Sequence, residues 1–310
     1  MYNVLITEKL PFTDKYDDIK FIYKPENMDS HDWLMENVND ADGLLITLVD
    51  RIDKEIIDSA KKLKVISTYS VGYDHIDVNY AISKNIFIGY TPDVLTESTA
   101  DFIFGLLINI SRKICHGYKT ILSNKWKYRW KPDFMLGTDV HGKTLGILGL
   151  GRIGYAVLKR ASGFDMNVIY NSRTQKSLNG YVSIEELFSR SDFIFVTLPL
   201  NNETRNIVNK SLISMMKETS YIINASRGGI VNEDDLYDAL LNKRIAGAAL
   251  DVFDKEPIKN DNRFAKLENV ILTPHMASAT TETRMAMANL ALRNLELGLH
   301  GQKPERYVKI

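Results

Sequence analysis

Apolar and polar positions alternate along this chain in two rhythms. Short apolar runs predict buried β-strands, while the stretches between them repeat their apolar positions every three to four residues, which predicts amphipathic helices. Strands separated by helices in this way are typical of α/β folds with parallel sheets. In the first part of the sequence the predicted strands are Asn3–Thr7, Gly43–Thr47, Lys64–Thr68 and Ile86–Gly89.

The pattern changes after Tyr90. Thr91-Pro92 interrupts regular structure, because the residue before a proline avoids helical geometry. The apolar stretch Thr96–Ile114 then predicts one long buried helix that links two domains. Residues 124–132 are rich in aromatic and basic side chains and predict an irregular connection, with a packed loop carrying solvated lysines as the plainer alternative.

A second series of strands and helices begins at Thr144. Its strands match a complete doubly wound nucleotide-binding sheet. They are Thr144–Leu148, Asn167–Tyr170, Asp192–Thr197, Tyr221–Asn224, Ile245–Ala249 and Asn269–Leu272. The last predicted helix, Thr280–Leu299, has room to return to the first domain.

Composition narrows the classes of function. The 39 basic and 39 acidic residues cancel, so we expect no nucleic-acid partner. The start of the sequence predicts a strand and lacks the features of a signal peptide, and no apolar run is long enough to span a bilayer. Cys115 is the only cysteine, and no cluster of His, Cys and carboxylates has metal-ligand spacing. We therefore expect a cytoplasmic enzyme without a metal or a membrane partner.

Three glycines lie between a predicted strand and a predicted helix, in the segment Gly149-Leu150-Gly151-Arg152-Ile153-Gly154. Gly149 suits a tight turn, Gly151 lets the backbone approach a pyrophosphate, and Gly154 lets the helix pack on the strand. The N-terminus of the helix supplies N–H groups for an anion. The segment predicts a dinucleotide site, against the alternative of a glycine turn without a ligand.

The next strand ends in Asn171-Ser172-Arg173-Thr174, where a site for NAD would carry a carboxylate for the ribose hydroxyls. Ser172 stands in the expected place, and Arg173 follows it. A guanidinium can bind a 2′-phosphate with two hydrogen bonds. The sequence therefore predicts a preference for NADP(H) over NAD(H). In the alternative, Arg173 is a solvated arginine that stacks on adenine with either cofactor.

Polar residues also follow three later strands, at the sheet edge where ligands bind in open α/β folds. The segments are Asn224–Gly229, Ala248–Pro257 and Leu272–Ser278. They carry Arg227, Glu256 and His275. Each residue taken alone has a structural explanation, whereas their order behind a phosphate turn favours a catalytic set.

These motifs, in this order and over nearly the full length, resemble the D-isomer-specific 2-hydroxyacid dehydrogenases. The resemblance implies that Arg227, Glu256 and His275 are catalytic. It implies that the loop around Ser70, Val71 and Gly72 binds the substrate carboxylate, together with Arg227 and His275. It also implies cofactor contacts for Thr99, Leu198, Pro199, Thr204, Ala225, Ser226, Asp251 and His275, in addition to the glycine segment, Ser172 and Arg173. The family commonly has a histidine where this protein has Thr197, which leaves the polar contacts of that loop open.

The resemblance implies two doubly wound Rossmann-like domains. The nucleotide-binding domain, residues 99–282, is inserted into a flavodoxin-like substrate domain made of residues 1–98 and 283–310. The Ser172–Thr174 ending and the Trp-rich connection resemble the glyoxylate/hydroxypyruvate reductase branch, which implies a homodimer. In that branch an aromatic residue of the connection reaches the partner's substrate site, and Trp130 or Phe134 is the candidate here.

The expected reaction is reduction of a small 2-oxo acid to the D-2-hydroxy acid with NAD(P)H. Arg227 would hold the substrate carboxylate, and His275 would donate the proton with help from Glu256. Dehydrogenases of D-lactate and of branched D-2-hydroxy acids are alternatives, since relatives of both kinds use the same set. A dinucleotide-sensing corepressor is the non-enzymatic alternative, and the intact catalytic set argues against it. A methyltransferase would leave that set without a role.

Overall fold

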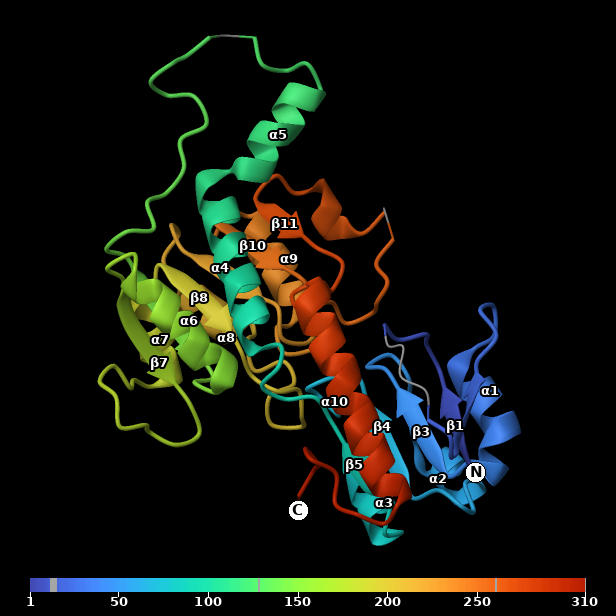
Figure 1. Cartoon of the computed structure of the whole chain (residues 1–310). Coiled ribbons are helices and arrows are strands. Elements are labelled where there is room, and N and C mark those ends of the chain that lie inside the picture. The colour runs from blue at the N-terminus through green and yellow to red at the C-terminus, as the bar shows by residue number, and fades with distance from the viewer. Residues whose placement is uncertain (12–15, 128, 260, 310) are drawn as a thin grey trace. The chain divides into compact units, whose positions relative to one another are not determined.

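The computed structural model describes residues 1–11, 16–127, 129–259 and 261–309 (Figure 1). The protein has two compact units, Met1–Leu95 with Ala279–Ile310, and Thr96–Ser278. The second unit is thus inserted in sequence between the two segments of the first. The units begin and end a few residues from the boundaries expected for the two domains.

The first unit is built on a parallel sheet with the order β2-β1-β3-β4-β5, which is the flavodoxin-like order. Its strands are β1 (Tyr2–Ile6), β2 (Ile19–Tyr23), β3 (Gly43–Ile46), β4 (Val65–Thr68) and β5 (Phe87–Gly89). Its helices are α1 (Ser30–Asn37), α2 (Lys54–Ser59), α3 (Val78–Ser83) and α10 (Thr281–Leu299). A short 3-10 helix, Val38–Asp40, follows α1.

The apolar pattern did not predict β2 or α1. Strand β2 lies at the edge of the sheet, and only Ile19 of its residues is buried. Helix α1 buries only Trp33 and Leu34. Both elements therefore have too few buried positions to produce a clear hydrophobic periodicity in the sequence.

The second unit holds a parallel sheet with the order β11-β10-β9-β8-β6-β7. All six strands expected in this part of the sequence are present, with ends that differ by one or two residues in several cases: β6 (Thr144–Leu148), β7 (Asn167–Asn171), β8 (Phe193–Val196), β9 (Tyr221–Asn224), β10 (Gly247–Leu250) and β11 (Val270–Leu272). The helices that follow these strands are α6 (Arg152–Ser162), α7 (Ile184–Arg190), α8 (Lys210–Met215) and α9 (Glu233–Leu241). The strand order reverses at β6, which lies between β7 and β8, so the glycine turn after β6 lies at the switch point where ligands bind.

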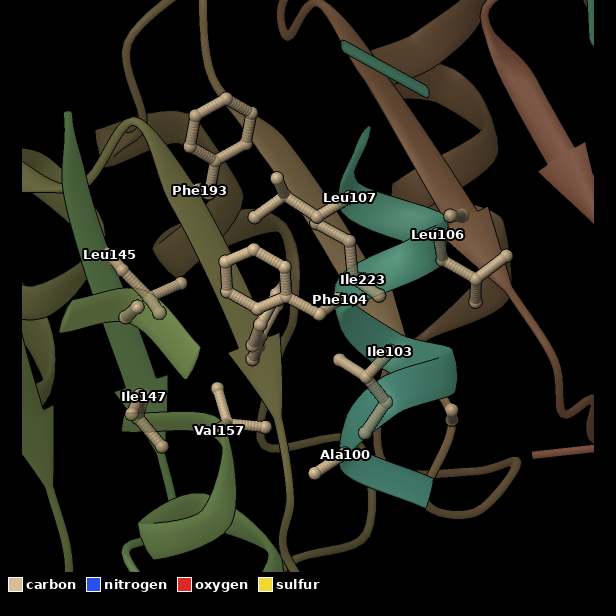
Figure 2. Packing of buried hydrophobic residues seen from close by; sticks show 14 of the residues in the cluster. Ala100, Ile103, Phe104, Leu106, Leu107, Leu145, Ile147, Val157, Phe193 and Ile223 are labelled. Carbon is tan, nitrogen blue, oxygen red and sulfur yellow. The ribbon is translucent and has the colours of Figure 1, made fainter. Parts of the chain in front are cut away.

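Helix α4 (Thr96–Arg112) forms part of the core of the second unit (Figure 2). Ile103, Phe104 and Leu107 are buried in one cluster with Ile147 of β6 and Ile223 of β9. Burying a side chain of this size stabilises the fold by about 1.5–3 kcal/mol. The apolar stretch predicted as one helix is therefore largely a core helix.

The expected helix over 96–114 is wrong at its C-terminal end. Lys113 has φ of 55°, in the left-handed region, and this breaks the helix. A separate helix, α5 (Ile114–Leu122), follows and buries none of its residues. No helix among the described residues is long and apolar enough to cross a membrane.

Candidate active site

The three glycines of the turn between β6 and α6 differ in how much space surrounds them. Gly149 has φ of 104°, and a Cβ there would lie 2.9 Å from the backbone oxygen of Thr197. A Cβ at Gly154 would lie 2.7 Å from the backbone oxygen of Gly149. A Cβ at Gly151, in contrast, would meet nothing within 4 Å. Packing within the protein therefore requires two of the glycines, and it leaves open space at the third.

That open space lies at the N-terminus of α6. Gly151 is the N-cap and has no side chain to accept from the first N–H groups of the helix. Gly151 and Arg152 are exposed, whereas Ile153 is partly buried against the core. Unpaired N–H groups, a helix dipole and close access fit the pyrophosphate of a dinucleotide.

The loop after β8 is fastened to this turn. The hydroxyl of Thr197 donates to the backbone oxygens of Gly149, at 2.6 Å, and Leu148, at 3.2 Å. Farther along, the hydroxyl of Thr204 donates to the oxygen of Pro199 and accepts from the N–H of Asn201. The polar contacts that the sequence left open at Thr197 thus go to the phosphate turn.

The end of β7 offers hydroxyls and cations. The Oγ of Ser172 donates to the oxygen of Thr174 at 2.8 Å, and the Nζ of Lys176 lies 3.2 Å from the Oγ1 of Thr174. Arg173 is exposed. The sequence has no carboxylate between Asn171 and Gly180, so nothing in this segment would repel a phosphate.

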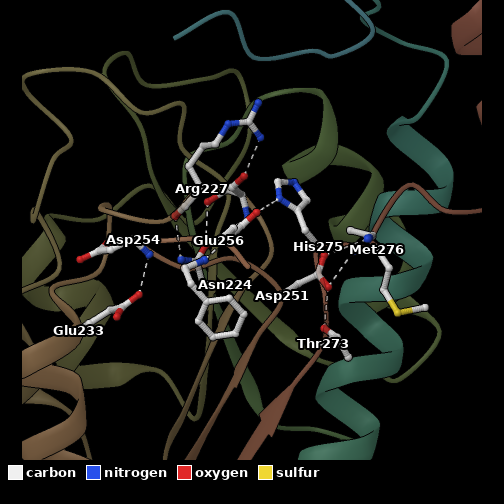
Figure 3. Close-up of polar contacts among 12 residues, drawn as sticks. Asn224, Arg227, Glu233, Asp251, Asp254, Glu256, Thr273, His275 and Met276 are labelled. Carbon is white, nitrogen blue, oxygen red and sulfur yellow. Dashed lines mark hydrogen bonds and ion pairs between the residues drawn. The ribbon is translucent and has the colours of Figure 1, made fainter. Parts of the chain in front are cut away.

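The ends of β9, β10 and β11 bring the predicted reacting residues together (Figure 3). The Nδ1 of His275 lies 2.7 Å from the Oε2 of Glu256, and their side chains are 24% and 25% exposed. The Oε1 of Glu256 accepts from the N–H of Phe253 at 2.9 Å. Within the described part of the protein, no hydrogen bond uses the Nε2 of His275, so this nitrogen is available to a substrate.

The charge state of Glu256 follows from these contacts. Burial by itself would raise the pKa of the carboxyl group. The hydrogen bonds from His275 and from the N–H of Phe253, together with the positive charge of Arg227, outweigh burial and lower this pKa below its ordinary value. Glu256 is therefore ionised at neutral pH, and its carboxylate faces the Nδ1 of His275.

Asp251 has a structural task that its sequence context did not reveal. Its side chain is fully buried, and its carboxylate accepts from the Oγ1 of Thr273 and from the N–H groups of Met276 and Ala277, at 2.6, 3.0 and 2.9 Å. These bonds hold the loop on which His275 adopts φ of 49°. The expected contact of Asp251 with the cofactor would be additional to this task.

Asn224, at the end of β9, holds the loop of Arg227. It is buried, its Oδ1 accepts from the N–H and the hydroxyl of Ser226, and its Nδ2 donates to the oxygen of Arg227 at 3.0 Å. Gly228 packs so closely on the backbone of Phe253 that a Cβ there would overlap the Phe253 oxygen. Arg227 therefore leaves the sheet beside the turn that carries Glu256. A buried polar residue closing an apolar strand is the signal that could have identified Asn224.

The other predicted residues differ in how far they are buried. Thr99 is buried in α4, and Ala225 is buried directly after β9. Leu198 is partly buried against the core. Trp130 and Phe134, on the connection after α5, are exposed. Among the described residues, no group of three or more His, Cys, Asp or Glu could hold a metal ion.

Ser70, Val71 and Gly72 follow β4 in the first unit. The Oγ of Ser70 donates to the oxygen of Gly72 at 2.6 Å, which draws this loop into a tight bend. No hydrogen bond among the described residues uses the N–H of Val71 or Gly72. Successive unpaired N–H groups in a bend can bind an anion.

Known proteins are similar to this one in sequence. The model of the NAD-binding domain of the D-isomer specific 2-hydroxyacid dehydrogenases matches residues 104–277. A glyoxylate reductase of Korarchaeum cryptofilum is 43% identical over 293 residues, which cover 93% of this protein and 88% of that one. The protein belongs to the D-isomer specific 2-hydroxyacid dehydrogenase family. It is therefore an NAD(P)-dependent oxidoreductase that acts on a CH–OH group.

Solved structures of other proteins agree with the fold. The TT0316 protein of Thermus thermophilus superposes with a TM-score of 0.92 at 38% identity, covering 99% of this protein and 100% of that one. An NADPH-dependent glyoxylate/hydroxypyruvate reductase of Sinorhizobium meliloti, in complex with NADP and malonate, superposes with a TM-score of 0.87 at 28% identity, covering 99% and 96%. The expected pair of Rossmann-like domains is thus confirmed.

Proposed function

We propose that this protein reduces a small 2-oxo acid of the glyoxylate or hydroxypyruvate type to the D-2-hydroxy acid, with NADPH preferred over NADH. The observation that carries the proposal is the hydrogen bond between His275 and Glu256, beside Arg227 and on the same sheet as the glycine turn. The substrate type is supported by the relative that is named a glyoxylate reductase.

Each residue of the site has a separate role in the proposed reaction. Bound reduced nicotinamide supplies the hydride for the carbonyl carbon. Arg227 holds the substrate carboxylate with its planar guanidinium and polarises the ketone. His275 donates the proton from Nε2 to the carbonyl oxygen, and such general acid catalysis contributes roughly 10²–10⁴-fold. Glu256 orients the imidazole through Nδ1 and favours its charged form.

In the first unit, we propose that the N–H groups of Val71 and Gly72 bind the substrate carboxylate. The bend that Ser70 closes, and the absence of other partners for these two groups among the described residues, support this role.

The cofactor would lie on the glycine turn, with Ser172 and Arg173 at its 2′-phosphate. The exposed guanidinium and the lack of a carboxylate in that segment support the preference for NADPH. Measuring kcat/KM with both cofactors tests it, using Arg173→Ala and the matched exposed arginine variant Arg190→Ala. We expect only Arg173→Ala to lose the preference, and an NADH preference in the wild type would contradict the proposal.

The substrate is tested by the loss of reduced-nicotinamide absorbance with glyoxylate, hydroxypyruvate, pyruvate and branched 2-oxo acids. Glyoxylate and hydroxypyruvate should give the highest kcat/KM, and hydroxypyruvate should give the D-product. A clear preference for pyruvate or a branched acid would instead identify a dehydrogenase of D-lactate or of branched D-2-hydroxy acids. Cofactor binding without turnover of any 2-oxo acid would favour the corepressor alternative.

We also propose a homodimer formed through α5 and the adjacent face of the second unit. Ile114, Tyr118, Ile121 and Leu122 of α5 are all exposed, which is unusual for an apolar helix. A cavity of about 1090 Å³ beside α5 includes Tyr221, Leu240, Ile245 and Leu267 in its lining. Sedimentation should give a dimer that Tyr118→Asp converts to monomer. Within the dimer, Trp130→Ala should change KM for the 2-oxo acid.

A further inference from the structure

The turn that carries Glu256, residues 253–256, has a second anchor outside the reacting set. Glu233, the first residue of α9, accepts from the N–H of Asp254 through its Oε1 at 2.7 Å (Figure 3). Within the described residues, no other side chain from outside the turn hydrogen-bonds to the turn's backbone. The anchoring N–H belongs to the residue that follows Phe253, whose own N–H donates to Glu256.

Three hydrogen bonds to carboxylate oxygens link Glu233 to His275 through this turn. Glu233 fixes Asp254, Phe253 fixes the Oε1 of Glu256, and the Oε2 of Glu256 faces the Nδ1 of His275. On its other side, the turn is held by the packing of Gly228 against Phe253. Without Glu233, the turn would be held by that packing, by the burial of the Phe253 side chain in the core and by the two hydrogen bonds of Glu256.

We infer that Glu233 is a positioning residue for the proton transfer: by accepting the N–H of Asp254, it keeps the turn in the form that places Glu256 against His275. This inference rests on the proposed function, in which His275 donates the proton. It gives a task to a residue outside the set Arg227, Glu256 and His275.

The carboxylate of Glu233 has no close ion-pair partner among the described residues. Burial raises the pKa of Glu233, and the nearby charges of Asp254 and Asp234 raise it further, while the N–H of Asp254 and the positive charge of Arg263 oppose them. Arg263 makes its close ion pair with Asp234 instead. These groups line a cavity of about 630 Å³ together with Asn232 and Lys255. A polar group held against such repulsion needs a compensating contact, and the bond to Asp254 is that contact.

The variants test separately the hydrogen-bond acceptor, the negative charge and the volume of the Glu233 side chain. Glu233→Met keeps the length of the side chain and removes the acceptor, whereas Glu233→Gln keeps an acceptor oxygen without the charge. Asp234→Ala is the matched control, because it removes a carboxylate from the same helical turn without contacting the Glu256 turn. Each variant is assayed in the full-length enzyme for glyoxylate reduction across pH, and for the Kd of NADPH.

For Glu233→Met we expect kcat to fall roughly 2- to 10-fold, the effect of losing one hydrogen bond. The basic limb of the pH–rate profile should move to lower pH, because a displaced Glu256 supports the charged imidazole less well. The Kd of NADPH should stay unchanged. Glu233→Gln and Asp234→Ala should resemble the wild type.

A wild-type kcat and pH profile in Glu233→Met would overturn the inference, and so would a Glu233→Gln enzyme as impaired as Glu233→Met. A lower melting temperature with an unmoved pH profile would show that Glu233 only stabilises the helix, which also overturns it. His275→Gln separates this failure from failure of the proposed function. If His275→Gln retains activity, the proposed proton donor is wrong. If it is inactive while Glu233→Met is normal, only the inference about Glu233 fails.

Discussion

Replacing Glu256 by Gln tests the centre of the proposed mechanism. The carboxylate makes a 2.7 Å contact with the Nδ1 of His275 and accepts the N–H of Phe253. In the Gln variant, one oxygen can still accept from Phe253, which leaves the amide nitrogen facing Nδ1. That nitrogen is a donor, and the Nδ1 of a charged imidazole is a donor too, so the two groups cannot form a hydrogen bond.

The magnitude follows from the geometry. Both side chains are only about one quarter exposed, so water screens the interaction weakly. A hydrogen bond to a charged group of this kind is worth about 1.5–3 kcal/mol. If the bond acts mainly on the protonated imidazole, kcat on the basic side of the pH–rate profile should fall roughly 10- to 100-fold. The basic limb of the profile should also move to lower pH.

The assay is steady-state reduction of glyoxylate at saturating NADPH, from about pH 5 to about pH 9, a range that spans the ordinary titration of histidine. Glu185→Gln, at an exposed position in the first turn of α7, is the control for loss of a surface carboxylate. An unchanged kcat together with an unmoved basic limb in Glu256→Gln would refute the reasoning. A higher KM for the 2-oxo acid alone would instead place Glu256 in substrate binding.

Three further predictions concern stability and the cofactor. Because the pKa of Glu256 is lowered from 4.5, its carboxylate stabilises the fold above about pH 4.5 and this contribution is lost as the pH falls through the lowered value. Calorimetry should therefore show the difference in Tm between wild type and Glu256→Gln shrinking in acid, and a constant difference would contradict it. Gly151→Ala should keep the wild-type Tm and raise the Kd of the dinucleotide, whereas Gly154→Ala should lower the Tm, because only its Cβ meets backbone; equal effects on Tm would contradict the assignment. Thr197→Val should raise the Kd of NADPH roughly 2- to 10-fold, with Thr197→Ser near wild type, since only valine loses the bond to Gly149; titration of the cofactor decides it.

Much of the fold was predictable from the sequence because its strands are buried and its helices amphipathic. The expected strands of the second unit are present, whereas the sheet order of the first unit agrees with what the family resemblance implied. The failures have local causes. Strand β2 is an edge strand with one buried residue, and α4 ends where Lys113 takes a left-handed conformation that no apolar pattern encodes.

The candidate site was predictable in its reactive residues and much less so in their supports. Arg227, Glu256 and His275 follow strand ends in a recognisable order. Asn224, Thr197 and Glu233 were not predicted, because a buried amide, a loop hydroxyl and a helix-terminal carboxylate each have many uses. Most of their partners are backbone groups, which carry no sequence signature.

The sequence by itself determined most of the buried strands and helices, where the phosphate turn lies and which side chains can react, because these depend on periodicity and on the order of residue types. Only the tertiary structure decided which polar groups meet. Glu256 reaches His275, Asp251 reaches Ala277 and Glu233 reaches Asp254 across separations of 19, 26 and 21 positions. Hydrogen bonds depend on distance in space, and the parallel order of β9, β10 and β11 sets those distances.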